Sequence, residues 1–107
     1  MRVHKCARVA TLRGMRKTQD EAVVRAVAAE IKARRMQLNI SQEEFAHRAD
    51  VHRSFVARLE LGQTQPSLAV LFRLVDALSA DITEVTTAIA RRAMTEKKTS
   101  LPPHRAG

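Results

Sequence analysis

The sequence predicts an all-α fold of five short helices. Apolar residues recur at intervals of three and four in five successive stretches, and helix-capping or helix-breaking residues separate those stretches. No stretch alternates apolar and polar residues as a half-buried strand does. The 107 residues include only three aromatic ones, so the core must be built from aliphatic side chains and alanine. That composition suits small helices in close contact, and the length fits one domain with tails.

The first helix is predicted over about residues 19–38. Thr18 and Glu21 form a T-x-x-E capping box at its start. Asn39 predicts its end, because asparagine readily adopts the left-handed conformation that terminates a helix. The predicted inward stripe contains one charged member, Arg35: Val24, Val27, Ala28, Ile31, Arg35 and Leu38.

Two very short helices should follow, joined by a tight turn. Ser41 and Glu44 form a capping box for the second helix, which should end near Ala49. Asp50 is the expected turn residue, since aspartate tolerates positive φ better than most residues. The third helix should start at His52 and end at Gly62. Their predicted inward residues are Phe45, Ala46, Ala49, Val56 and Leu59.

The last two helices lie beyond a polar loop with the helix breaker Pro66. Ser67 should cap the fourth helix, and Asp81 with Glu84 should cap the fifth. The inward residues expected in the fourth are Leu68, Leu71, Phe72, Val75 and Leu78. Those expected in the fifth are Ile82, Val85, Ile89 and Ala93.

The formal net charge of +8 is concentrated at the two ends of the chain. Residues 1–19 hold six lysines and arginines and residues 97–107 hold three, and neither end contains an acid. The middle therefore keeps 10 of the 19 positive charges against all 11 acids. A basic tail is either a solvated end or a nucleic-acid arm. Arg13, Arg16 and Lys17 are the candidates for such an arm.

Helices as short as the second and third are marginal alone in water. Their pairing makes sense as a helix-turn-helix at about 41–61, in which the first helix braces the second against an external surface. Three segments together, S-Q-E-E-F-A, R-S-F-V-A-R-L-E-x-G and P-S-L-x-x-L-F-R-L, resemble the Cro/cI-type (Xre-like) helix-turn-helix family of bacterial and phage repressors.

The resemblance covers about residues 22–90. It implies a five-helix, lambda-repressor-like DNA-binding domain over 19–95, with flexible basic tails at 1–18 and 96–107. Asp50 and Ser79 depart from the family, which usually has glycine at the first position and often at the second.

The resemblance implies that the third helix lies in the major groove and reads base edges from its outward face. Positions 53, 54, 57 and 58 share one helical face, opposite Val56 and Leu59. The alternative is that Arg53 and Arg58 are ordinary solvated charges. The expected base contacts are Arg53, Ser54, Ala57 and Arg58, and the expected phosphate contacts are Gln42, His52, Gln63 and Thr64.

Two further expectations concern helix packing. Arg35 either extends its charge to water or pairs with Glu60, and the pair is favoured because the family often places arginine and glutamate at these positions. The family commonly binds two-fold DNA sites as a homodimer. Ile89 and Ala93 on the fifth helix are the candidate dimer surface.

Other classes of function find little support in the sequence. Cys6 is the only cysteine, so no internal disulfide forms and a cytoplasmic location is expected. The histidines His4, His47, His52 and His104 contain no pair at i+3 or i+4, so neither a metal nor another cofactor is expected. No apolar run approaches a membrane span, and no catalytic constellation is present. A DNA-binding regulator, most simply a repressor acting by operator occupancy, is the favoured interpretation. The alternative is a protein-interaction module, such as the antitoxin of a toxin–antitoxin pair.

Overall fold

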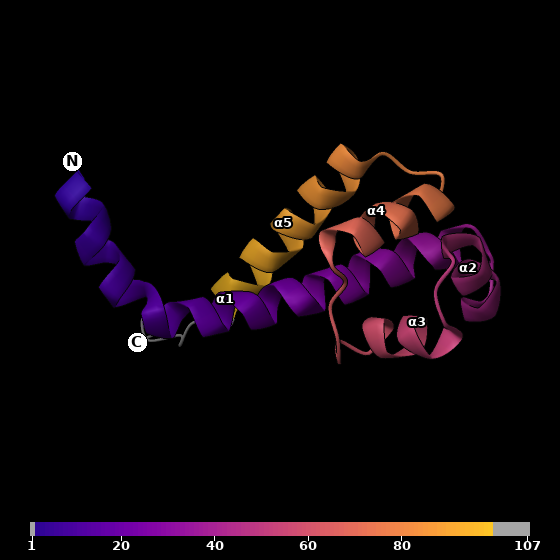
Figure 1. Ribbon diagram of the computed structural model, residues 1–107, viewed down its shortest axis with the longest axis horizontal. Coiled ribbons are helices and arrows are strands. Elements are labelled where there is room, and N and C mark those ends of the chain that lie inside the picture. The colour runs from indigo at the N-terminus through magenta and orange to yellow at the C-terminus, as the bar shows by residue number, and fades with distance from the viewer. Residues whose placement is uncertain (1, 100–107) are drawn as a thin grey trace.

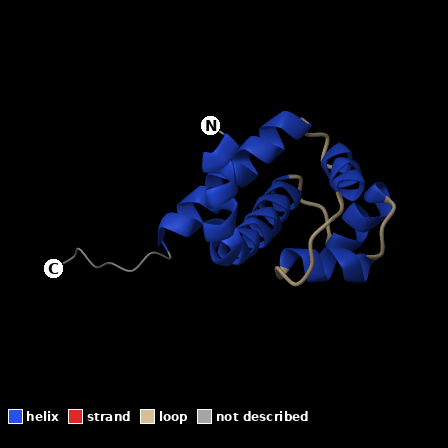
Figure 2. Cartoon of the chain, turned by 60° about the vertical axis from the view of Figure 1, so that its left-hand side comes forward, coloured by secondary structure: helices blue, strands red, loops and turns tan. Residues whose placement is uncertain are grey.

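The computed structural model describes the backbone of residues 2–99 and the side chains of residues 20–95. Every regular element in this part of the chain is helical (Figures 1 and 2), which confirms the predicted fold class. The helices are α1 (Arg2–Gln37), α2 (Gln42–Ala49), α3 (Arg53–Glu60), α4 (Leu68–Ala77) and α5 (Ile82–Thr99). Among the described helices, none combines the length and apolar character needed to cross a membrane.

Helix α1 is much longer than predicted, at 36 residues. It runs through Thr18, so the predicted start at residue 19 and the Thr18 capping box are wrong. A capping residue starts a helix only where the backbone N–H groups after it lack helical carbonyl partners four residues earlier. Residues 2–17 contain no proline to interrupt these hydrogen bonds, so the helix continues through them. The first turns of α1, indigo in Figure 1, lie at an angle to the rest of the helix and extend beyond the other four.

The helix boundaries further along the chain follow local signals. The side-chain oxygens of Ser41, Ser67 and Asp81 accept hydrogen bonds from the backbone N–H groups of Glu44, Val70 and Glu84. Three helices end at residues with left-handed backbone: Asn39 (φ 59°), Asp50 (φ 59°) and Ser79 (φ 54°). The predictions for Asn39, Asp50 and the three caps are therefore confirmed. Gly62 (φ 75°) follows the end of α3 in the same conformation.

The core lies where the five helices meet. Its fully buried large side chains come from every helix: Ile31, Phe45, Val56, Leu59, Leu74 and Val85. The α2–α3 pair packs at one end of α1, and α4 contacts both α2 and α5 (Figure 1). The most extensive packing joins α1 to α5. The small α2 and α3 therefore gain their stability from a scaffold of three other helices.

Three residues predicted to face inward are instead exposed: Leu38 (42%), Leu68 (68%) and Phe72 (52%). Leu38 lies past the last residue of α1, so the helical spacing no longer determines its direction. Leu68 and Phe72 lie on the side of α4 away from the core, whereas Leu74, Val75 and Leu78 fill the inner side. With so many apolar residues on α4, spacing alone did not decide which face is buried.

Helix α5 closes the core. Ile89 is buried, with 8% exposure, and belongs to the core cluster, against which Ala93 packs from its partly buried position. The prediction that Ile89 faces inward is therefore confirmed, and both residues contact the core of their own chain. Since α5 packs extensively on α1, its apolar stripe leaves little area for a second subunit.

Candidate nucleic-acid interface

Helix α3 presents one side to the core and the other to solvent. Val56 and Leu59 are fully buried. The residues predicted to contact bases lie on the opposite side: Arg53, Ser54 and Arg58 are exposed, and Ala57 is half-buried. The structure therefore brings all four together on one outward face. Three of them have side chains directed to solvent, and Ala57 can offer only its methyl group.

Two arginines on this face lack partners within the described part of the chain. Arg34, Arg35, Arg48 and Arg92 all form ion pairs with carboxylates. The guanidinium groups of Arg53 and Arg58 form no hydrogen bond or ion pair with any described side chain or backbone group. A guanidinium held at a solvent-exposed position can donate two parallel hydrogen bonds to O6 and N7 of guanine. The outward face of α3 thus has the donors that major-groove readout requires.

The C-terminal end of α3 is fixed to α1 by a bidentate ion pair. Arg35 Nε donates to Glu60 Oε2 at 2.6 Å, and Arg35 Nη2 donates to Glu60 Oε1 at 3.0 Å. The two side chains are only 12% and 3% exposed. The hydrogen bond that Arg35 donates to Glu60 raises the pKa of Arg35 above its already high ordinary value, against the opposing effect of burial. The predicted Arg35–Glu60 pair is therefore confirmed.

The Arg35–Glu60 pair also fixes the position of α2 through two further hydrogen bonds. Arg35 Nη1 donates to the carbonyl of Ile40 at 2.7 Å, in the connection between α1 and α2. Gln42 Nε2, at the first position of α2, donates to Glu60 Oε1 at 3.0 Å. One carboxylate thus joins three helices. The Gln42 amide has two N–H donors, and the bond to Glu60 occupies one of them. The other remains available to a phosphate.

His52 occupies the N-cap position of α3, as predicted, but its side chain forms no capping hydrogen bond. The first turn of α3 is therefore not capped by the His52 ring. Histidine is a poor N-cap compared with serine or aspartate, whose short side chains reach back to the first turn. The exposed ring is free to face a phosphate beside α3.

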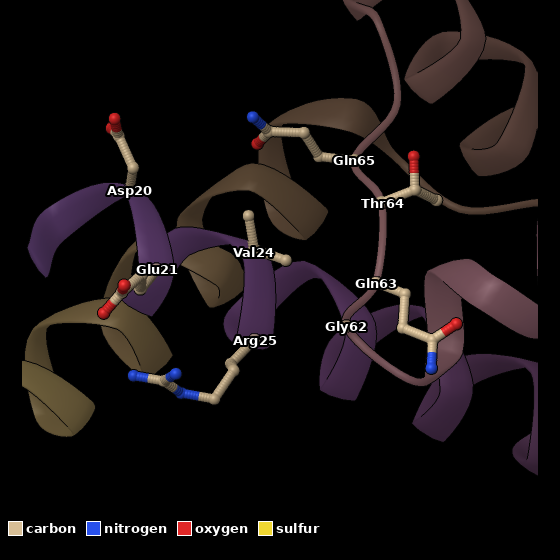
Figure 3. A pocket seen from close by; sticks show the side chains of 8 residues that line it. All are labelled: Asp20, Glu21, Val24, Arg25, Gly62, Gln63, Thr64 and Gln65. Atoms are coloured by element: carbon tan, nitrogen blue, oxygen red, sulfur yellow. The ribbon is translucent and has the colours of Figure 1, made fainter. Parts of the chain in front are cut away.

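Gln63 and Thr64 follow α3 in an extended loop that forms one wall of a shallow hollow of about 410 Å³. The opposite wall is α1, with Asp20, Glu21 and Arg25 (Figure 3). The Gln63 and Thr64 side chains point away from these acids in the close-up. Gln63 is exposed and Thr64 half-buried, so Gln63 is the better placed of the two to meet a phosphate.

The sequence interpretation missed two arginines that position the motif. Arg73 on α4 donates from Nε to the carbonyl of Ala49 at 3.2 Å, where its positive charge favours the negative end of the α2 dipole. Arg92 on α5 donates from Nε to Glu30 Oε1 at 2.8 Å, and Arg34 donates from Nε to Glu30 Oε2 at 2.5 Å. The i, i+4 spacing of Glu30 and Arg34 was visible in the sequence. The approach of Arg92, 62 residues away, was not.

Other candidate residues contribute less to the site. The side chains of Arg13, Arg16 and Lys17 lie outside the described part, although their backbone belongs to α1. His47 is exposed on α2, and the described side chains form no group of three or more potential metal ligands.

The comparisons with known proteins agree with this geometry. A helix-turn-helix family model matches residues 31–85, which is half of the chain and includes α2, α3 and α4. A search of curated proteins finds no match.

Similar solved structures include the clp gene regulator ClgR from Corynebacterium glutamicum. One structure of it has a TM-score of 0.67 at 21% identity, covering 72% of this chain and 82% of that one. The restriction-modification controller protein C.Esp1396I, as a tetramer in complex with its natural 35 base-pair operator, has a TM-score of 0.63 at 15% identity, covering 67% and 95%. At these identities the likeness shows a shared fold.

The family match rests on the segment that forms the two short helices and their scaffold. The motif segments, the exposed face of α3 and the ion pair behind it all lie within the matched region or directly beside it. The chain belongs to the Cro/cI-type (Xre-like) helix-turn-helix family of DNA-binding transcriptional regulators.

Proposed function

We propose that the protein is a cytoplasmic repressor that binds a two-fold operator as a homodimer and acts by occupying it. The observation that carries this proposal is the outward face of α3, where Arg53 and Arg58 are exposed and unpaired within the described part of the chain. Major-groove readout needs such donors on the outward face of the second helix of the motif, where Arg53 lies in the first turn and Arg58 in the last. The structure of C.Esp1396I on its operator supports the idea that a fold of this kind assembles on DNA.

The proposed base contacts and phosphate contacts are assigned from the hydrogen-bond donors that face outward. Arg53, Ser54 and Arg58 read base edges, with Ala57 limited to contact with a thymine methyl group. Gln42, His52, Gln63 and Thr64 surround this face and hold the DNA backbone. Phosphate contacts fix register and orientation without reading sequence. Gln42 is the best prepared of them, because Glu60 already holds its amide in place.

Selection of binding sites from random DNA by the purified protein tests the proposal. The expected result is a sequence with two-fold symmetry and half-sites about one helical turn apart. Arg58→Ala should then lower operator affinity by about 1–3 kcal/mol, relax the preference at one base pair per half-site, and leave random-DNA affinity nearly unchanged.

Arg91→Ala is the matched control, because Arg91 is an exposed arginine on α5. It should leave base preference unchanged. If Arg58→Ala weakens binding to all sequences equally, Arg58 contacts phosphate and the assignment of the reading face is wrong. If no DNA sequence is selected, the alternative function as a protein-interaction module is favoured.

A further inference from the structure

Helix α4 carries a continuous exposed stripe that no other helix in the described part covers. Its N-terminal half is apolar, with Leu68 at 68% and Phe72 at 52% exposure. Its C-terminal half is charged, with the exposed Arg73 and Asp76. Leu68 and Phe72 are one helical turn apart, and exposed apolar patches rimmed by polar residues mark interaction surfaces.

A hollow of about 430 Å³ lies at the end of this stripe. Phe72 and Asp76 form its α4 side, and Ala80 and Ile82 form the side that leads into α5. Arg73, Val75 and Asp81 also line it, so the hollow carries both signs of charge beside apolar side chains. The exposed aromatic side chain and the charges of the stripe therefore occupy the same surface.

The charges on the stripe are self-complementary. Arg73 and Asp76 are three residues apart. When two α4 helices lie antiparallel about a two-fold axis between positions 74 and 75, Arg73 of each copy opposes Asp76 of the other. Within the helical range of α4, this register also places Phe72 of each copy opposite Ala77 of the other. Reciprocal contacts of this kind define an isologous interface.

Arg73 keeps donors for this role. Only its Nε is engaged, by the carbonyl of Ala49. A guanidinium has five N–H donors in a fixed planar arrangement, so the terminal nitrogens remain available to a carboxylate. In addition, Ile89 on α5 is buried in the core of its own chain, so the apolar stripe of α5 is not exposed as an alternative docking surface.

We infer that a second copy of this chain docks on the α4 stripe, with Arg73 and Asp76 paired reciprocally and Phe72 covered by the α4 helix of the second copy. The inference rests on the proposed binding of a two-fold operator by two copies. It replaces Ile89 and Ala93 with Leu68, Phe72, Arg73 and Asp76 as the dimer surface.

Sedimentation of the full chain over a range of concentrations, without DNA and on an operator, tests the interface. Wild type should form a dimer. Phe72→Glu should shift the monomer–dimer equilibrium at least tenfold toward monomer, while its thermal unfolding midpoint stays close to that of wild type because Phe72 is half-exposed. Met94→Glu, at a 65% exposed residue of α5, is the matched control and should leave the dimer intact.

Charge reversal tests the register independently of apolar area. Asp76→Arg should weaken the dimer at least tenfold, because it sets two arginines against each other. Arg73→Glu combined with Asp76→Arg should restore most of the association. Thermal unfolding of the double variant controls for the lost bond between Arg73 and Ala49. Failure of the double variant to recover, with a normal unfolding midpoint, would contradict the reciprocal pairing.

Three outcomes separate the dimer surface from the proposed function. If Phe72→Glu binds a single half-site as wild type does but loses affinity for the full operator, the dimer surface is supported. If wild type is monomeric in solution and on its operator, or if Phe72→Glu and Asp76→Arg both leave the dimer unchanged, the α4 interface is refuted while DNA binding stands. A wild-type chain that dimerises but selects no DNA sequence would refute the proposed function alone.

Discussion

At the scale of single residues, Arg35 does more than any other described side chain to hold the motif in place. Its guanidinium donates to Glu60 twice and to the Ile40 carbonyl once. Removing one partner of a buried pair leaves the other charge stranded, which typically costs about 3–5 kcal/mol. The orientation of α3 relative to α1 and α2 should therefore depend on this residue.

We expect Arg35→Met to lower the free energy of unfolding by about 3–5 kcal/mol in a urea titration. Lys32→Met is the appropriate control, because Lys32 is exposed on the same helix, and it should change stability by less than about 0.5 kcal/mol. Arg34 is unsuitable as a control, since it donates to the buried Glu30. Equal effects of the Arg35 and Lys32 variants would contradict a structural role for the pair.

Residue-scale predictions succeeded where the signal was local or carried by the family pattern. The capping bonds of Ser41, Ser67 and Asp81 involve a residue three positions away, so the sequence displays both partners. Glu60 was assigned to Arg35 through the resemblance. The bond from Gln42 to Glu60 was not predicted, because it depends on how closely the start of α2 approaches the end of α3. Which arginine reaches which carboxylate across helices is a property of the packing.

At the scale of helices, the α1–α5 contact contains a buried carboxylate. Glu30 is 6% exposed. Burial by itself would raise the pKa of Glu30, but hydrogen bonds from Arg92 and Arg34, together with their charges, outweigh it and lower the pKa below its ordinary value. A carboxyl group whose pKa falls on folding stabilises the folded state when it is ionised. The joint between α1 and α5 should therefore depend on pH.

We expect Glu30→Gln to lower the free energy of unfolding by about 1.5–3 kcal/mol at neutral pH. The stabilisation by Glu30 is complete above the unfolded-state pKa of about 4.3 and is lost as the pH falls through the lower folded-state value. The difference between wild type and Glu30→Gln should thus shrink on acidification. Urea titrations across this pH range measure it. A difference that stays constant with pH would show that the carboxylate charge is not what stabilises the joint.

Glu43→Gln supplies the baseline for that comparison, since Glu43 is exposed and forms no ion pair with a described side chain. Its difference from wild type should be smaller than that of Glu30→Gln, because only the favourable placement of Glu43 in the first turn of α2 is lost.

The success of the helix-scale predictions depended on whether the apolar residues of each helix lie on one face only. Spacing identified the inward residues of α2 and α3 correctly, because apolar residues are few there and lie on one side. On α4, apolar residues surround the helix, so Leu68 and Phe72 were assigned inward although they are exposed. The start of α1 was misplaced for a related reason: the sequence contains a good capping pattern at Thr18 but nothing upstream that stops a helix.

At the scale of the whole molecule, the charge is unevenly distributed along the chain. The middle of the chain is close to neutral, and the positive excess lies at the ends. Electrostatic attraction to DNA should then come mostly from outside the packed domain, whereas the base readout that we propose comes from α3. The uneven distribution of charge can be predicted from the sequence directly, because it requires only counting the charged residues. The placement of the terminal side chains relative to DNA is a separate question.

We expect replacement of Arg13, Arg16 and Lys17 with alanine to lower affinity for operator and random DNA alike and to keep their ratio. Each lost phosphate contact should reduce the slope of log affinity against log salt concentration by about one unit. Titrations at several salt concentrations measure this slope. An unchanged affinity at low salt would identify this segment as a solvated end.

The three left-handed helix ends at Asn39, Asp50 and Ser79 have a consequence for how long the molecule persists. This backbone costs roughly 1–2 kcal/mol at a typical non-glycine residue, and less for asparagine and aspartate. Small domains are stable by only about 5–15 kcal/mol, so removable strain of this size raises the unfolded fraction that cellular proteases can degrade. A regulator with a short half-life lets its genes respond soon after its synthesis stops. Glycine at all three positions should lengthen the half-life measured after synthesis is arrested, and the delay before the regulated genes respond should lengthen with it.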